Sequence, residues 1–414
     1  MRLKDFKDSA PRPYPKDQEK GPSRPSHLRQ VNARGLLRLL RKHNPCSKAD
    51  LVRLSGLSAP TVSSAVSYLE TQGLIENLGE GESSGGRPPG LLRFRASHGC
   101  VVGVDIGGTR LRMMLADLNG TVITQWSTQF SEKQKTPKAV CARMHEGLKA
   151  MCQESGMPLR KVLHLTAGAP GITNVHTGVV ISAPNLKAWD DVPLRAMIEK
   201  QTGIPALIEN DTNLAAVGEH WHGASAGMDD FIFVALGTGV GAGIFLQGRL
   251  HHGSAWSAGE IGYMGVNGLP REALRVRSIG QMERTIGGAG IEREWLRVLK
   301  RSGKGGKTVL AKLRAPQIFD LAQDGDPLAE EVLRYAARVL ADCLASLALL
   351  LDPETIILGG GVGSHPELCR CTQKLLEQNE FARPTLVASS LGTQAQLHGA
   401  ISMSLSAIES TLLG

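Results

Sequence analysis

The 414-residue chain lacks an apolar run long enough to span a membrane, and its N-terminus is polar and rich in proline. A membrane-spanning helix needs roughly 20 consecutive apolar residues. A secretory signal needs a shorter apolar stretch behind a basic start. Because the sequence has neither, we expect a cytoplasmic protein that does not associate with membranes.

Cysteines are few and irregularly spaced. There are seven, at Cys46, Cys100, Cys141, Cys152, Cys343, Cys369 and Cys371. An odd number of scattered cysteines argues against a disulfide framework and for reduced thiols. We interpret the close pair Cys369 and Cys371 as structural.

Excess positive charge is missing from the last three quarters of the chain. Residues 1–100 contain 17 Lys and Arg against 9 Asp and Glu, which accounts for the whole net charge of +8. A basic segment on an otherwise neutral protein favours binding to a polyanion such as DNA. A solvated basic tail is the alternative, which charge alone does not exclude.

Three helices are predicted in this basic segment, after a proline-rich arm at 1–26 that we expect to be disordered. Val31, Leu36, Leu37 and Leu40 are assigned to one face of a first helix that ends before Pro45. The second helix has the capping-box pattern, with Ser47 three residues before Asp50.

The third helix has the features of a DNA-recognition helix. Pro60 is tolerated in its first turn, and Val62, Val66 and Leu69 fall on one face at helical spacing. Short hydroxyl side chains at its start and on the opposite face suit contacts to base edges or phosphates in the major groove. The predicted DNA-binding residues of this helix are Ser58, Thr61, Ser63, Ser64 and Ser67.

Two short strands at 74–78 and 91–94 follow, joined by a glycine-rich segment. This pattern is typical of the wing of a winged helix-turn-helix. Arg87 in the wing is predicted to enter a minor groove or to meet a phosphate. Residues 27–97 are therefore predicted to be a DNA-binding winged helix domain, with a protein-interaction module as the alternative.

Two glycine loops lie about 130 residues apart, DIGGT at 105–109 and GTGVGAG at 237–243. Each lies between apolar runs, 100–104 and 111–118 for the first and 231–236 and 244–246 for the second. We interpret both loops as hairpin turns whose backbone N–H groups can approach phosphate oxygens. The duplication predicts two related lobes with a nucleotide between them; two ordinary hairpins are the alternative.

These loops belong to eight segments that occur in the order typical of one family. They are DIGGT, AGAPGITN, APNLKAW, ENDTNLAAVGE, LGTGVGAGI, AGEIGYM, GQMERTIGGAGI and LDPETIILGGGVG. From about Cys100 to its C-terminus the chain resembles the ROK family of sugar kinases and repressors, within the actin and hexokinase superfamily.

The resemblance implies an α/β fold, a two-lobed actin/hexokinase-like (ribonuclease H-like) ATPase fold preceded by the winged helix domain. The first lobe is expected at 98–222, completed by a C-terminal helix at 394–414, and the second at 223–393.

The resemblance also implies a sugar site with a catalytic base. Transfer of the γ-phosphate of ATP to a sugar hydroxyl needs a carboxylate beside that hydroxyl. Asp211 matches the catalytic base of the family. The residues expected to bind the sugar are Asn185, Asn210, Asp211, Glu260, Tyr263 and Glu283.

A nucleotide site is implied by the same resemblance, with ATP and Mg²⁺ as the expected cofactors if it is active. Asp105 is expected to hold Mg²⁺ through water. The phosphate loops match Gly107, Gly108, Thr109, Gly237, Thr238 and Gly239, and the adenosine loop matches Gly359, Gly360 and Gly361.

The sequence departs from the family at a structural zinc site. Many ROK proteins bind zinc through one His and three Cys, a ligand set suited to tetrahedral Zn²⁺. This chain has Tyr263, Leu274, Val276 and Gln281 at the corresponding positions. We therefore expect no zinc and no other structural metal.

Two functions remain open. We favour a sugar-responsive DNA-binding regulator of carbohydrate metabolism, a repressor with a sugar effector, acting on operator DNA as a homodimer or homotetramer. The alternative is an ATP-dependent hexose or amino-sugar kinase with an accessory N-terminal domain, and one protein can have both activities.

Overall fold

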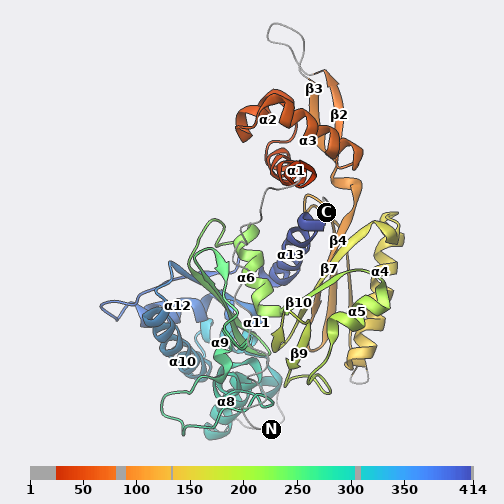
Figure 1. The fold of residues 1–414 in the computed structure, drawn as a ribbon. Helices are drawn as coiled ribbons and strands as arrows, with labels where there is room; N and C mark the ends of the chain where they lie inside the picture. The colour runs from red at the N-terminus through yellow and green to blue at the C-terminus, as the bar shows by residue number, and fades with distance from the viewer. Residues whose placement is uncertain (1–24, 81–89, 132–133, 304–308, 412–414) are drawn as a thin grey trace. The chain divides into compact units, whose positions relative to one another are not determined.

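A computed structural model describes residues 25–80, 90–131, 134–303 and 309–411 of the chain (Figure 1). These residues form two compact units. The first unit contains the residues up to Cys100 together with 117–121 and the residues from Ser406 onward. The second contains 101–116 and 122–405.

Between residues 25 and 94, the described part of the first unit forms three α-helices and a three-stranded antiparallel sheet with the strand order β1-β3-β2. Its elements are α1 (Pro25–Lys42), β1 (Cys46–Ser47), α2 (Lys48–Ser55), α3 (Ala59–Thr71), β2 (Ile75–Glu80) and β3 (Gly90–Phe94). Leu92 of β3 lies opposite both Cys46 and Asn77, so β3 is the central strand. The capping box of Ser47 and Asp50 forms as predicted, and Ser58 caps α3.

The apolar core of this unit agrees with the sequence pattern except at one residue. Val62, Val66 and Leu69 of α3 are buried, as predicted. On α1 the residues Ala33, Leu36, Leu37 and Leu40 are also buried. The assignment of Val31 to the same face is wrong, because Val31 is 49% exposed. Val31 precedes Leu40 by nine residues, about half a turn out of phase at 3.6 residues per turn.

The second unit contains two α/β lobes. The sheet of the first lobe has the order β10-β7-β4-β5-β6. Its strands are β4 (Cys100–Ile106), β5 (Arg110–Asp117), β6 (Val122–Gln129), β7 (Val162–Ala169) and β10 (Ala206–Asn210), with a small hairpin of β8 (Ile172–Asn174) and β9 (Val179–Ser182) beside it. Because β7 and β10 are parallel, their carboxyl ends lie at the same edge of the sheet. The loop before Ile172 and the turn after Asn210 meet at this edge.

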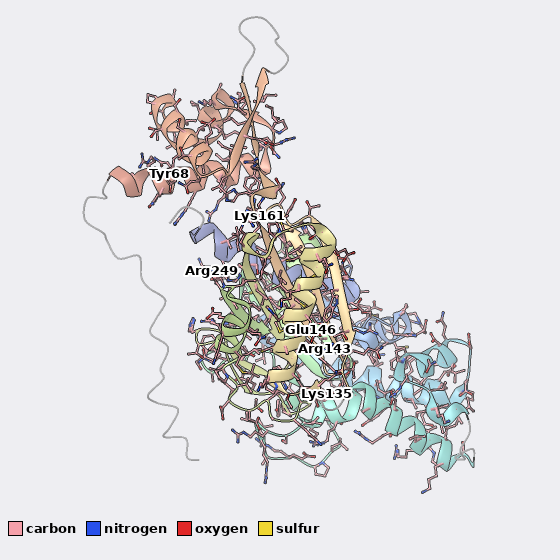
Figure 2. The ribbon with its side chains drawn as sticks, turned by 90° about the vertical axis from the view of Figure 1, so that its right-hand side faces the viewer. Tyr68, Lys135, Arg143, Glu146, Lys161 and Arg249 are labelled. Atoms are coloured by element: carbon pink, nitrogen blue, oxygen red, sulfur yellow. The ribbon has the colours of Figure 1, made fainter. Side chains whose placement is uncertain are left out.

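Helices cover both faces of this sheet (Figure 1). They are α4 (Pro137–Ser155), α5 (Leu194–Thr202), α6 (Asp211–His222) and α13 (Ala395–Thr411). On one face, Gly147 of α4 lies so close to Trp126 that a Cβ there would be 2.5 Å from the indole ring. On the other face, Gly103 of β4 faces the backbone of Leu397 in α13. Figure 2 shows the outer side of α4, where Arg143 and Glu146 form an ion pair of 2.7 Å.

The sheet of the second lobe has the order β13-β12-β11-β14-β15. Its strands are β11 (Phe231–Leu236), β12 (Val240–Leu246), β13 (Arg249–Leu250), β14 (Thr355–Gly359) and β15 (Thr385–Ala388). The helices of this lobe are α7 (Gln281–Ile286), α8 (Gly288–Arg301), α9 (Ala315–Gln323), α10 (Pro327–Leu351), α11 (Gly360–Gly363) and α12 (Pro366–Leu376). Ala215 and Ala216 of α6 pack on Phe231, Phe233 and Phe245, so α6 also contacts this second sheet.

Both glycine loops form hairpin turns, and both turns are shorter than predicted. The turns are 107–109 and 237–239. Residues 240–243 already pair with β11. Gly243 lacks a side chain because α6 packs there: a Cβ would stand 2.5 Å from that of Ala216. These later glycines permit close packing of a strand on a helix and do not form the turn.

Helix α10 buries one face in the second lobe, with Ala336, Leu340, Leu344 and Leu347 in the core. Across the parts of the chain that the structure describes, no helix combines the length and the apolar character needed to cross a membrane.

Candidate functional site

A cavity of about 280 Å³ opens between the two lobes of the second unit. Residues of both lobes line it, and they include most of those predicted for the sugar and nucleotide sites. The predicted residues on its wall are Asp105, Gly107, Gly108, Asn185, Asn210, Asp211, Gly237, Thr238, Gly239, Glu260, Tyr263, Glu283 and Gly360. Thus residues as far apart in the sequence as Asp105 and Gly360 meet in one cleft.

Three predicted nucleotide residues do not line this cavity. Thr109 is exposed in the first turn. Gly361 is exposed at the start of α11, with its N–H group near Gly237. Gly359 is buried, and a Cβ there would be 2.2 Å from the ring of Phe233. The structure therefore gives Gly359 a packing role, and the predicted nucleotide contacts of these three residues stay predictions.

Asp211 lies at the first turn of α6, with its carboxylate near the N-terminus of that helix. Its Oδ1 accepts a hydrogen bond of 2.8 Å from the Thr212 N–H. Burial raises the pKa of Asp211 to about 7, and the neighbouring carboxylate of Asp105 adds to the rise. A carboxyl group that titrates near neutral pH suits a general base.

Asn210 caps α6 and fixes the position of Asp211. Its Oδ1 accepts hydrogen bonds from the N–H groups of Thr212 (2.8 Å) and Asn213 (3.0 Å). Its Nδ2 donates to the carbonyl of Gly171 at 3.0 Å. One N–H of the side-chain amide is left to donate to a ligand. The other polar groups of the side chain bond to the protein, so the main role of Asn210 is to position Asp211.

Glu209 and His252 support this segment from behind, and the sequence had not indicated them. Glu209 is 1% exposed, and its Oε1 accepts from Asn210 N and Asn213 Nδ2 at 2.8 and 2.9 Å. Its Oε2 lies 2.8 Å from Nε2 of His252 in the second lobe. The buried carboxylate therefore ties the Asn210–Asp211 turn to both lobes.

Glu260 and Glu283 bring two more carboxyl groups into the cleft. Burial raises the pKa of Glu260 to about 7, with further contributions from Asp211 and Glu283. Glu283 accepts from the Val240 N–H (3.0 Å) and from Asn185 Nδ2 (3.1 Å). Because Asn185 belongs to the first lobe, this hydrogen bond joins the lobes. A cluster of carboxyl oxygens can accept hydrogen bonds from several hydroxyl groups of one ligand.

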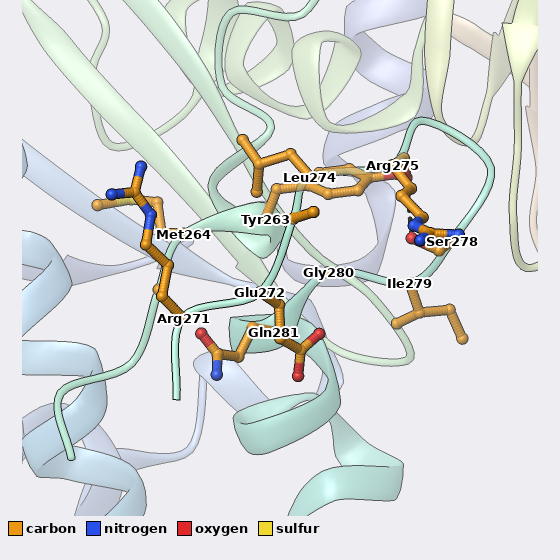
Figure 3. Close-up of a pocket in the computed structure, with 12 residues that line it drawn as sticks. Tyr263, Met264, Arg271, Glu272, Leu274, Arg275, Ser278, Ile279, Gly280 and Gln281 are labelled. Atoms are coloured by element: carbon orange, nitrogen blue, oxygen red, sulfur yellow. Dashed lines mark hydrogen bonds between the residues drawn. The ribbon is translucent and has the colours of Figure 1, made fainter. Parts of the chain in front are cut away.

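Tyr263 lies at the edge of the cleft and beside a second cavity of about 410 Å³ formed by the segment 263–281 (Figure 3). Its hydroxyl donates to the carbonyl of Val276 at 3.0 Å. Burial raises the pKa of Tyr263 to about 12, so the phenol is neutral. In this arrangement the phenol holds the loop.

The residues at the four zinc positions do not fit a zinc ion. Leu274 and Val276 are exposed apolar side chains, and the phenol of Tyr263 is engaged by the loop. Gln281 instead braces the segment, because its Oε1 accepts from Val266 N (3.2 Å) and its Nε2 donates to the Pro270 carbonyl (2.9 Å). Within the described ranges, no three His, Cys, Asp or Glu side chains are grouped as metal ligands.

Arg112 is a wall residue of the cleft that the sequence interpretation missed. Its Nε and Nη2 atoms lie 2.9 and 2.7 Å from Oδ2 of Asp105, and its Nη1 donates to the Thr393 carbonyl. Burial raises the pKa of Asp105, and the guanidinium opposes that rise. The two residues flank one hairpin turn, a placement that the predicted turn would have indicated.

The predicted DNA-binding residues lie together on the exposed side of α3. Ser58, Ser63, Ser64 and Ser67 are exposed. Thr61 is half-buried, with its Oγ1 2.8 Å from the hydroxyl of Ser58. Arg87 lies outside the described residues. Contacts of these side chains with DNA stay predictions.

Comparisons with known proteins agree with this architecture. The ROK family profile matches residues 101–407, and the MarR family profile matches residues 30–82. The xylose repressor of Caldicellulosiruptor bescii is 27% identical over 394 residues, which cover 92% of this chain and 96% of the repressor.

Two solved structures are similar. A ROK family transcriptional regulator, described as a homologue of the MLC protein of Escherichia coli, has a TM-score of 0.74 and 24% identity, covering 94% of this chain and 98% of that one. A ROK family glucokinase from Streptomyces griseus, solved with glucose and AMPPNP, has a TM-score of 0.64 and 28% identity. The similarity covers 74% of this chain and 100% of the glucokinase.

The MarR match therefore lies within the first unit of the structure, and the ROK match covers the second unit. The fold is the two-lobed hexokinase-like fold of ROK proteins, preceded by a winged helix domain of the MarR type. The chain belongs to the ROK family.

Proposed function

We propose that this protein is a DNA-binding transcriptional regulator whose affinity for operator DNA responds to a sugar bound in the cleft of the ROK core. The observation that supports this most is the presence of both parts in one chain. An exposed hydroxyl-rich helix, α3, lies in a basic winged domain, and a cleft with several carboxyl groups lies in the core. The similarity to a xylose repressor over nearly the full length supports the same proposal.

The sugar would bind through Glu260, Glu283 and Asp211, with Asn185 exchanging its hydrogen bond to Glu283 for one to a sugar hydroxyl. Such an exchange alters an inter-lobe contact, so ligand binding and lobe closure become coupled. Ligand then biases an equilibrium between DNA-competent and DNA-incompetent states by no more than its differential affinity for the two. Reading two operator half-sites would require at least a dimer.

The proposal is tested by titrating the full-length protein with its native promoter DNA in fluorescence anisotropy, over a panel of pentoses and hexoses. We expect one sugar class to shift the dissociation constant about tenfold, the order of a typical coupling free energy. Affinity should also fall steeply with salt, because phosphate contacts release counterions. Promoter binding that no sugar changes would count against the proposal.

A sugar kinase is the second candidate, and Asp211 is the observation that favours it. Its carboxyl group has a pKa of about 7 and lies beside the glycine turns at 107–109 and 237–239. Formation of ADP that depends on the sugar and is lost in Asp211→Asn would support this activity. Absence of ADP formation over the same sugar panel would remove it.

A further inference from the structure

We infer that Arg112 takes the place of a divalent cation beside Asp105, so that the cleft binds its ligand without a metal and is built for sensing. The inference rests on the proposed function, because it concerns how the same cleft accepts a sugar. It assigns to Arg112 a role that the sequence pattern of the phosphate loop does not reveal.

The geometry of the pair supports this assignment. Asp105 ends β4, and its side chain is 7% exposed. Two nitrogens of Arg112 lie within 2.9 Å of the same oxygen, Oδ2. A guanidinium in this position neutralises the carboxylate and satisfies it through charge-assisted hydrogen bonds.

The guanidinium is also held from its other side. Its third nitrogen, Nη1, donates to the carbonyl of Thr393, just before α13 begins. Arg112 is therefore fixed between β4 and the segment that leads into α13. Arginine stays protonated at any physiological pH, so the countercharge is permanent.

A magnesium ion does not fit beside this pair. Mg²⁺ binds carboxylates through a nearly ideal octahedral shell that usually keeps several waters. At Asp105 such a shell would have to displace or adjoin a fixed guanidinium of the same sign. Without the guanidinium, the buried carboxyl group of Asp105 has to be neutralised in another way, by a proton or by a bound cation.

The remaining charged residues of the cleft also favour a neutral ligand over a nucleotide. Asp211, Glu260 and Glu283 line the wall, and Arg112 is the single Lys or Arg among the described residues that line it. Without a metal, this cleft repels the phosphates of a nucleotide and accepts the hydroxyl groups of a neutral sugar. Asp211 then acts as an acceptor for a sugar hydroxyl.

The experiment uses Mn²⁺ alone as the probe and the full-length protein, with free Mn²⁺ measured by electron paramagnetic resonance. We expect Asp105→Asn to leave Mn²⁺ binding of the otherwise wild-type protein unchanged. Arg112→Ala should create one additional Mn²⁺ site per chain, at least about tenfold tighter than any wild-type site. Adding Asp105→Asn to Arg112→Ala should remove that site.

Arg110→Ala is the matched control, because Arg110 is an exposed arginine on the same strand and its removal changes the net charge equally. It should bind Mn²⁺ as the wild type does. Arg112→Gln, with a longer neutral side chain, replaces Arg112→Ala if circular dichroism shows that the alanine variant is unfolded.

Two results would overturn the inference. One is a wild-type Mn²⁺ site that Asp105→Asn removes; the other is a folded Arg112→Ala or Arg112→Gln variant that gains no Mn²⁺. Both leave the proposed regulator intact, because the sugar response of the promoter complex is measured separately on the same protein preparations.

Discussion

Two carboxyl groups of the cleft are buried, so their ionised forms are energetically unfavourable. Asp211 and Glu260 both have pKa values raised to about 7, chiefly by burial. Each one-unit rise of a pKa corresponds to about 1.4 kcal/mol of preference for the neutral form. When they ionise at neutral and alkaline pH, these two predicted ligand-binding residues therefore lower the free energy of unfolding.

Glu260→Gln should consequently stabilise the protein at high pH. The pKa of Glu260 rises from 4.5 in the unfolded chain to about 7 in the folded state, so the folded state binds more protons between these values. The stability that protonation gives is complete below the lower value and is lost as pH rises through the upper one. The glutamine variant escapes this loss, and we expect a gain of about 1–3 kcal/mol at about pH 8 and little change at about pH 5.

Chemical denaturation of both proteins at the two pH values measures this difference. Glu292→Gln, at an exposed ion pair with Arg314, is the control and should show no comparable pH-dependent gain. An equal effect of Glu260→Gln at both pH values would show that the carboxyl group is not destabilised by burial.

On the winged domain, the residue-scale prediction concerns the serines of α3. Ser63→Ala combined with Ser64→Ala should reduce discrimination between promoter and random DNA, because both hydroxyls are exposed on the predicted recognition helix. We expect a loss of about 1–3 kcal/mol in specificity. Competition titrations with the two DNAs measure it, and unchanged discrimination would place base recognition on another surface.

Residue types and spacing were sufficient to predict most side chains of the cleft. Binding a sugar or a phosphate needs carboxylates, amides and glycines, and these occur here in short motifs. They did not indicate that Glu209 reaches His252, since these residues belong to different lobes and meet only in the folded chain. Val31 was misassigned because this apolar residue of α1 was counted with a face from which it lies about half a turn away.

At the scale of elements, α6 connects the two sheets and presents Asp211. Its approach to β12 leaves no room for a Cβ at Gly243, 2.5 Å from the Cβ of Ala216, and little room at Gly241, where a Cβ would lie 3.1 Å from Thr212 Oγ1. The sequence predicted a long glycine turn here because backbone freedom and close packing select the same residue type. Only the strand register separates these two uses of glycine.

Gly243→Ala should therefore destabilise the protein by about 1–3 kcal/mol, the usual cost of overpacking a core. A Cβ at this position would lie 2.5 Å from the Cβ of Ala216 and 3.1 Å from the carbonyl oxygen of Thr212. Urea denaturation measures the change. Gly361→Ala, where the structure places nothing within 4 Å, is the control and should be nearly neutral; equal effects would contradict the packing role of Gly243.

The segment 263–281 gives a second prediction for an element. Gln281 and Tyr263 hold this loop by hydrogen bonds to main-chain atoms of Val266, Pro270 and Val276. We expect chelator-washed protein to contain substoichiometric zinc and to keep its melting temperature. Stoichiometric zinc in elemental analysis, with loss of the fold on its removal, would contradict this account of the loop.

At the scale of the whole molecule, the chain separates two kinds of chemistry into two units. The excess positive charge lies within residues 1–100, and the carboxyl groups of the cleft lie in the ROK core. Helix and strand patterns were enough to predict the fold of the winged domain, and the order of the motifs was enough to predict the fold of the ROK core. Sequence patterning did not reveal the three-stranded sheet completed by β1, because two residues are too few to show a period.

The central claim is that a sugar in this cleft controls DNA binding, and Glu260 tests it most directly. In anisotropy titrations with native promoter DNA, Glu260→Ala should bind DNA like the wild type without sugar, because Glu260 lies outside the basic domain. The shift of about tenfold that the effective sugar causes in the wild type should largely disappear, since a hydroxyl acceptor is lost. An identical sugar response in wild type and Glu260→Ala would contradict the account and place the effector at another site.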